Sequence, residues 1–163
     1  MSENKKTQKI SVICARGSLE DVYASLVLAN GARMEGMEAQ IFFTFFGLDA
    51  IHAKRMRRLH TATVGNPSLT MPGGLPFPTL LGMLPGVEAG VSSMMRRRME
   101  KLDIPPVDEF LEIFKASGGR AYACKMAMDM FGYTRADLWE GVDGVLTVGE
   151  FYEKSQDARI IFT

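Results

Sequence analysis

The sequence predicts an α/β fold with a largely parallel sheet of five strands. Two observations support this fold class: short apolar runs alternate with segments that carry helix signals, and the segments between most runs are long enough for the crossover connections that parallel strands need. A third concerns size, since 163 residues suit a single domain with a substantial core. We therefore expect one domain over residues 1–163.

The N-terminal elements can be assigned in order. Residues 9–14 (KISVIC) form an apolar, β-branched run that predicts the first strand. Ser18 begins a capping-box pattern and predicts the start of a helix, which ends near Gly36. Residues 39–46 (AQIFFTFF) predict a second buried strand, and residues 48–59 predict a helix with arginines on its outer side.

The C-terminal half continues the alternation of helices and strands. Capping boxes begin at Thr134 and Thr147. The expected helices cover 92–102, 106–117, 124–131 and 147–156, and the expected strands cover 120–123, 143–148 and 158–162. For five strands, the simplest three-layer arrangement is a flavodoxin-like sandwich with strand order 2-1-3-4-5.

An insertion at about 61–91 interrupts this pattern. Residues 61–87 contain no charged side chain, five prolines and five glycines, which excludes one regular helix. We expect the insertion to pack against a neighbouring subunit or to cover the ligand crevice. Basic clusters at 54–58 and 96–98 flank it, so peripheral contact of residues 61–95 with an anionic membrane surface is an alternative.

The composition limits the classes of function. The chain has 19 basic and 19 acidic side chains, and this balance argues against a general nucleic-acid binder. The polar start (MSENKKTQK) has no secretory apolar region, so we expect a cytoplasmic protein. In a reducing cytosol, two cysteines are more often reactive or buried than cross-linked.

The two cysteines end predicted strands. Cys14 ends the first strand and Cys124 the third, which are neighbours in the order 2-1-3-4-5, roughly 5 Å apart. A helix starting at Cys124 would favour its thiolate, and Lys125 adds positive charge. The alternative is an inert buried cysteine. For Cys14 a structural role is favoured, although it could act as a second thiol within ~7 Å of Cys124.

Methionine stands at every second position after Cys124. Met126, Met128 and Met130 could form a soft, polarizable wall beside a sulfur atom. The i, i+4 spacing of Met126 and Met130 instead favours a place in the core for these two.

The chain resembles the DsrE/DsrF-like family of sulfur-relay proteins, in the branch that carries a large mid-domain insertion and is often labelled peroxiredoxin-like. The matching segments are 42–48 (FFTFFGL), 82–86 (GMLPG) and 122–130 (YACKMAMDM). With the order of helices and strands between them, they cover nearly the whole chain. The segment around the cysteine is the specific one.

The resemblance implies a flavodoxin-like homo-oligomer whose cysteine carries sulfur as a persulfide, and that cysteine maps onto Cys124. TusA-like and rhodanese-like proteins are the implied partners. Gly17, Ser18, Lys125 and Met126 are possible neighbours of the site. Persulfide exchange is thiol–disulfide-type chemistry, for which we expect no cofactor.

Other functions remain as alternatives. A thiol peroxidase would need a hydroxyl three residues before the cysteine, where this chain has Ala121. A flavin site would need a phosphate loop after the first strand, and the acidic residues of ARGSLED oppose one. His52 and His60 lack metal-ligand spacing and are expected to be surface or packing residues. A non-catalytic oligomeric interaction protein or a membrane-associated adaptor is the remaining class.

Overall fold

The computed structural model describes residues 8–63, 70, 78, 84 and 86–163. At its centre lies a parallel five-stranded sheet with the order β4-β3-β2-β1-β5. The strands are β1 (Lys9–Cys14), β2 (Glu38–Phe43), β3 (Arg120–Cys124), β4 (Gly144–Leu146) and β5 (Arg159–Phe162). The predicted α/β class and the parallel sheet are confirmed.

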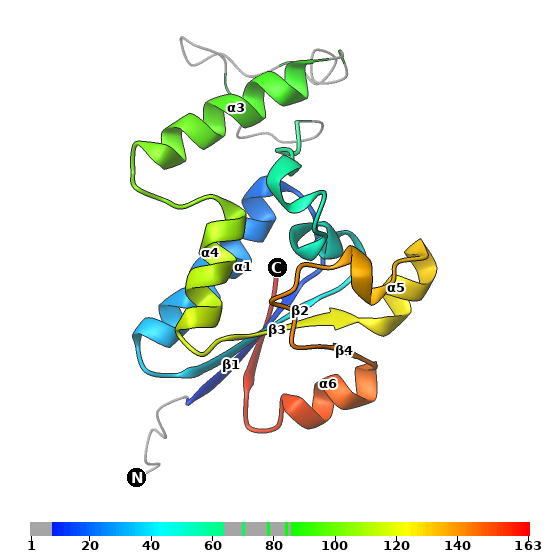
Figure 1. Ribbon diagram of the computed structural model, residues 1–163. Coiled ribbons are helices and arrows are strands. Elements are labelled where there is room, and N and C mark those ends of the chain that lie inside the picture. Colours follow the sequence, from blue (N-terminus) through cyan, green and yellow to red (C-terminus); the bar gives the residue numbers. More distant parts are fainter. Residues whose placement is uncertain (1–7, 64–69, 71–77, 79–83, 85) are drawn as a thin grey trace.

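Helices cover both faces of the sheet (Figure 1). α1 (Leu19–Met34) and α4 (Val107–Ala116) pack on one face and against each other. On the other face lies α6 (Val148–Lys154), whose Phe151 ring stacks on Phe42 of β2 with 4.5 Å between centroids. α3 (Val87–Glu100) lies outside the three layers.

The predicted strand order is wrong. β3 pairs with β2, and β5 returns to the free side of β1. The steps from β1 to β2 and from β2 to β3 run in one direction and place α1 and α4 on one face. The return to β5 runs in the opposite direction and places α6 on the other face, as right-handed crossovers require.

The helix expected over residues 48–59 is also absent. The segment forms two 3₁₀ helices instead, η1 (Phe45–Ile51) and η2 (Met56–Arg58). Between them the backbone pairs with another part of the chain: Trp139 donates to the carbonyl of Ile51 at 2.7 Å, and Ala53 donates to the carbonyl of Asp137 at 2.9 Å. These long-range bonds replace the hydrogen bonds that would continue a helix.

The predicted helix starts are found at their capping residues. The Ser18 side chain accepts a hydrogen bond from the Asp21 amide at the start of α1. Thr147 and Glu150 form a reciprocal capping box at α6, and Thr134 forms another at η3 (Arg135–Asp137). α3 begins several residues before the predicted 92, directly after Gly86, whose φ of 89° suits glycine.

The proposed insertion at 61–91 falls largely outside the described residues. Residues 64–69, 71–77, 79–83 and 85 belong to this part. The expectation that the insertion is a lid, a subunit contact or a membrane contact therefore stays a prediction. Among the described residues, no helix has the length and apolar character needed to cross a membrane.

Candidate functional site: the end of the third strand

Cys124 lies at the carboxyl edge of the sheet. It is the last residue of β3 and the N-cap of α5 (Lys125–Phe131), so the chain passes directly from strand to helix at this thiol. The residue is 2% exposed, and its side chain does not cap the helix. Reaction with another molecule therefore requires that the covering residues move or that the incoming group displaces them.

The residues after Cys124 come in exposed and buried pairs: 125 and 126 are exposed, 127 and 128 are buried, and 129 and 130 are exposed. Met128 is 4% exposed, whereas Met126 and Met130 are each 55% exposed. The expectation that Met126 and Met130 belong to the core is wrong. Their i, i+4 spacing does place them on one face of α5, but that face is turned away from the sheet. They give the thiol's own helix an exposed apolar surface.

Lys125 is held by a neighbour on the same helix. Its Nζ lies 3.0 Å from Oδ2 of Asp129, one helical turn away, and both side chains are exposed. Such an exposed pair contributes little to stability and shares the lysine's charge with a carboxylate. The positive charge expected beside the thiol is therefore partly offset.

Cys14 is placed in a different environment. It ends β1, is fully buried, and its Sγ lies 3.6 Å from the carbonyl oxygen of Arg16. Burial, the largest cause, raises the pKa of this thiol to about 11, and hydrogen bonding with Ser25 and Thr163 only partly opposes that rise. At neutral pH it is held as the un-ionised thiol, which is a poor nucleophile.

The structure does not bring the two thiols together. β2 lies between β1 and β3, so two strand spacings of about 10 Å separate them laterally. The register pairs Cys14 with Phe43 and Phe43 with Ala123, which puts Cys124 one residue further along and on the opposite face of the sheet. A direct disulfide needs Cα atoms within ~7 Å, so this arrangement does not suit one.

Gly17 and Ser18 lie at the end of β1, in the loop before α1. Gly17 packs so closely on the turn after β2 that an added Cβ would lie 2.5 Å from the carbonyl oxygen of Phe46. Ser18 caps α1, as described above. Both residues belong to the loop that follows β1. Because β2 lies between β1 and β3, this loop does not adjoin the end of β3 within the sheet.

The turn after β2 was predicted to be strand, since the expected strand ran to residue 46, but β2 ends at Phe43 and Phe45 and Phe46 belong to η1. Phe45 has a φ of 45°, a left-handed conformation rare for an aromatic residue, and it is 42% exposed. Phe46 is 64% exposed, and its ring lies 5.6 Å from that of Phe131 in α5. The apolar run FFTFF indicates a buried strand from the sequence alone, because the exposure of its last two phenylalanines depends on the tertiary fold.

Both histidines have protein neighbours. His52 is buried, its ring meets the Tyr133 ring edge-on with 5.0 Å between centroids, and its Nδ1 accepts a hydrogen bond from the Lys54 amide. The Nδ1 of His60 lies 3.9 Å from Glu88. Within the described ranges, no three His, Cys, Asp or Glu side chains are grouped as metal ligands.

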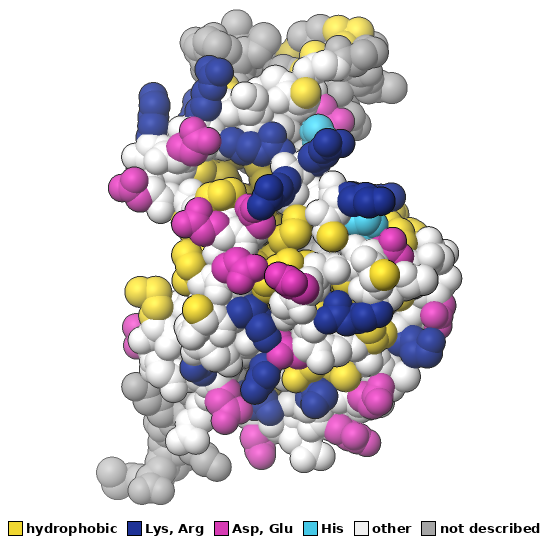
Figure 2. All heavy atoms as spheres, viewed as in Figure 1, with side chains coloured by type: hydrophobic (Ala, Val, Ile, Leu, Met, Phe, Trp, Pro, Cys, Tyr) yellow, Lys and Arg dark blue, Asp and Glu magenta, His cyan; other side chains and the backbone are white. Residues whose placement is uncertain are grey.

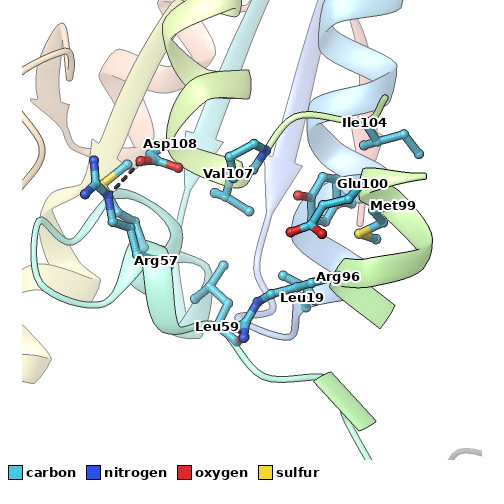
Figure 3. A pocket seen from close by; sticks show the side chains of 12 residues that line it. Leu19, Arg57, Leu59, Arg96, Met99, Glu100, Ile104, Val107 and Asp108 are labelled. Atoms are coloured by element: carbon cyan, nitrogen blue, oxygen red, sulfur yellow. Dashed lines mark hydrogen bonds and ion pairs between the residues drawn. The ribbon is translucent and has the colours of Figure 1, made fainter. Parts of the chain in front are cut away.

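A cavity of about 440 Å³ lies between the start of α1, η2, the end of α3 and the start of α4 (Figure 3). Leu19, Leu59 and Val107 form apolar walls, and Arg57 is bound to Asp108 at 2.7 Å at one side. Neither cysteine lines this cavity, so it is separate from the thiol site.

Comparison with known sequences identifies the family. The model of the DsrE/DsrF/DrsH-like family matches residues 6–162. The chain belongs to this family. A relative described as sulfur carrier protein DsrE2, from Allochromatium vinosum, is 33% identical over 138 residues, which cover 83% of this chain and 86% of that protein. The uncharacterized protein YrkE of Bacillus subtilis is 23% identical over 141 residues, 85% of this chain and 86% of its own.

Two solved structures share the fold. The ychN protein of E. coli superposes with a TM-score of 0.55 at 18% identity, covering 96% of this chain and 99% of that one. A protein of unknown function, MTH1491 from Methanobacterium thermoautotrophicum, gives 0.53 at 14% identity, covering 95% and 98%. At these identities the likeness concerns the fold alone, and it agrees with the flavodoxin-like class.

Proposed function

We propose that this chain is a sulfur carrier that holds sulfane sulfur as a persulfide on Cys124. The family assignment and the relative described as a sulfur carrier support a sulfur-relay role. The observation that carries the choice of residue is the contrast between the thiols. Cys124 stands at the junction of β3 and a short helix with exposed side chains, whereas Cys14 is enclosed and held as the thiol.

The proposed transfer is a thiol–disulfide-type exchange. The Cys124 thiolate attacks the outer sulfur of a donor persulfide, the donor S–S bond breaks, and the donor leaves as a thiolate. Cys124 then carries the outer sulfur as its own persulfide, and attack by an acceptor thiolate passes that sulfur on. No net oxidation occurs, because each step exchanges one S–S bond for another.

The donor and acceptor proposed here are proteins with reactive cysteines, of the TusA-like and rhodanese-like classes. Phe46, Met126 and Met130 support such docking, since they expose apolar surface beside the thiol's helix. The same surface supports assembly of the chain into a homo-oligomer. Sedimentation as a monomer at micromolar concentration would contradict that assembly while leaving the carrier proposal intact.

The test is intact-mass spectrometry after incubation with inorganic polysulfide. Wild type and Cys14→Ala are expected to gain the mass of one or more sulfur atoms, whereas Cys124→Ser gains none. Cys14→Ala is the matched control, since it removes the other thiol, and circular dichroism verifies that each variant is folded. Loading of Cys124→Ser, or no loading of a wild type whose thiol still titrates, contradicts the proposal. The second result would favour a non-catalytic interaction protein.

A further inference from the structure

A second cavity, of about 710 Å³, lies at the carboxyl end of β1. It is bounded by the loop after β1, the η1–η2 region, residues 59–62 and the start of α3. Its size is in the range of small-molecule sites. Unlike the cavity of Figure 3, it is lined mainly by polar and charged side chains, and neither cysteine contributes to it.

Basic side chains predominate in its lining. Arg16, Lys54, Arg55 and Arg58 line the cavity together with His60, against two carboxylates, Asp49 and Glu88. Figure 2 shows Lys and Arg side chains gathered around the region where α3 meets the main body, with His side chains among them. The formal charge of the lining is therefore positive even with His60 neutral.

Two of these cations have no close ion-pair partner among the described residues, although Lys54 is near enough to Asp137 to help the hydrogen bonds from Thr134 lower the pKa of that carboxyl. Arg55 is bound to Asp49 at 2.9 Å, and Arg16 lies 4.0 Å from Asp21. Lys54 and Arg58 form no ion pair with any described residue. Apart from this longer-range interaction of Lys54, their charges are available to an anion in the cavity.

Thr61 provides an independent indication of a ligand. The residue is 1% exposed and lines the cavity, yet its Oγ1 has no hydrogen-bond partner among the described residues. Its amide is fixed by a 2.9 Å bond to the Ser92 hydroxyl, so the backbone position is set. A buried hydroxyl without a partner costs free energy, and a rotation of the side chain that brings Oγ1 to a ligand oxygen in the cavity would remove that cost.

The N-terminus of α1 adds a smaller contribution. α1 has 16 residues, and its N-terminal end, capped by Ser18, borders the cavity. Such an end attracts anions. Glu20 and Asp21 in its first turn offset part of this attraction, so the basic side chains and Thr61 are the main determinants.

We propose that this cavity binds a small tetrahedral dianion, an oxyanion of sulfur or phosphorus. Lys54 and Arg58 supply charge and charge-assisted hydrogen bonds, and the Thr61 hydroxyl donates to one of the anion's oxygens. The proposal concerns a second site on the same chain and does not depend on persulfide chemistry at Cys124.

The test is isothermal titration calorimetry on the full chain with sodium sulfate and with sodium phosphate, against sodium chloride at equal ionic strength. Wild type and Cys124→Ser are expected to bind a dianion equally well and chloride far more weakly. Lys54→Gln/Arg58→Gln is expected to lose roughly tenfold or more in affinity. The control Arg98→Gln removes an exposed cation of α3 outside the cavity and should bind as wild type does.

Thr61→Val separates a ligand contact from a structural role. Valine keeps the shape and removes the hydroxyl, so affinity should fall by roughly fivefold. Without anion, the thermal midpoint of Thr61→Val should equal or exceed that of wild type, because the hydroxyl has no described partner to lose. Wild-type affinity in Thr61→Val overturns the proposed site.

The remaining outcomes distinguish the source of the anion. Equal binding of sulfate, phosphate and chloride by wild type overturns the proposal, and so does an equal loss in Arg98→Gln and the double variant. Sedimentation with phosphatidylglycerol vesicles, compared with phosphatidylcholine vesicles, tests lipid phosphates. Vesicle binding without binding of either free dianion would replace this proposal with peripheral membrane contact.

Discussion

The ends of β1 and β3 carry the same residue type at the same edge of one sheet, yet their surroundings differ. At β1, backbone encloses Cys14: the Thr44 amide donates to its carbonyl at 3.0 Å, and Gly47 packs against the same carbonyl. At β3, Cys124 is followed by a seven-residue helix whose Met126 side chain is half exposed. Position at the carboxyl edge therefore does not by itself make a cysteine reactive.

The difference arises from neighbours on the sheet. β1 and β3 each lie one place from an edge of the sheet, but the edge strand beside β1 is β5, and Thr163 after β5 donates its amide to the carbonyl of Ile13. The edge strand beside β3 is β4, which has only three residues. The end of β1 is therefore covered by backbone on both sides, from the turn after β2 and from the residue after β5, whereas Cys124 can be uncovered by moving a short helix. Local opening of this kind requires few contacts to break.

The largest expected effect tests how tightly the end of β1 is enclosed. In Gly47→Ala, the added Cβ would lie 2.1 Å from the carbonyl oxygen of Cys14, so backbone must shift. We expect the free energy of unfolding to fall by about 3 kcal/mol, measured by urea denaturation. The control is Gly31→Ala in α1, where a Cβ meets nothing within 4 Å and a gain of up to about 1 kcal/mol is expected. Equal stabilities of the two variants would contradict the enclosed environment.

The second-largest expected effect distinguishes the buried from the exposed methionines of α5, the helix that follows Cys124. Met128→Ala should lower the free energy of unfolding by about 2 kcal/mol, because this side chain is buried against the core. Met126→Ala should change it by less than about 0.5 kcal/mol, because more than half of that side chain is exposed. Urea denaturation of both variants measures the contrast. If Met126→Ala is the more costly change, the outward face of α5 is buried in solution, for example in an oligomer.

Local sequence signals were sufficient for most individual elements. The apolar run that ends at Cys14 forms β1, and the capping residues Ser18 and Thr147 begin helices where expected. These signals act over a few residues, so each can be recognised without the rest of the fold. The position of Cys124 at the end of a strand was also predicted from such a signal.

Features that depend on distant segments were not predictable in the same way. Strand order depends on which edge the chain returns to, and residues 51–53 bind the backbone of 137–139 instead of continuing a helix. The i, i+4 pair Met126 and Met130 identified a shared face but not the side of α5 that meets the sheet. No sequence motif marks the cavity proposed to bind an anion. Arg16 is distant in the sequence from Lys54 and Arg58, and the three residues come together only in the folded chain.

The smallest expected effect concerns the pH dependence of stability. Burial raises the pKa of Cys14 from an ordinary value of 9.0 to about 11, so the folded state holds this proton more tightly than the unfolded chain does. The resulting stabilisation is complete below pH 9 and is lost as the pH rises toward 11. At pH 10 the loss should be about 1 kcal/mol, since one pKa unit corresponds to about 1.4 kcal/mol.

Urea denaturation of wild type and Cys14→Ala at pH 8 and pH 10 measures this effect. Cys14→Ala lowers stability at both pH values because it leaves a cavity, so the informative quantity is the difference between the two proteins. That difference should shrink by about 1 kcal/mol from pH 8 to pH 10, because only wild type carries the buried thiol. A difference that does not change with pH would mean that water reaches Cys14, and the contrast between the ends of β1 and β3 would then be lost.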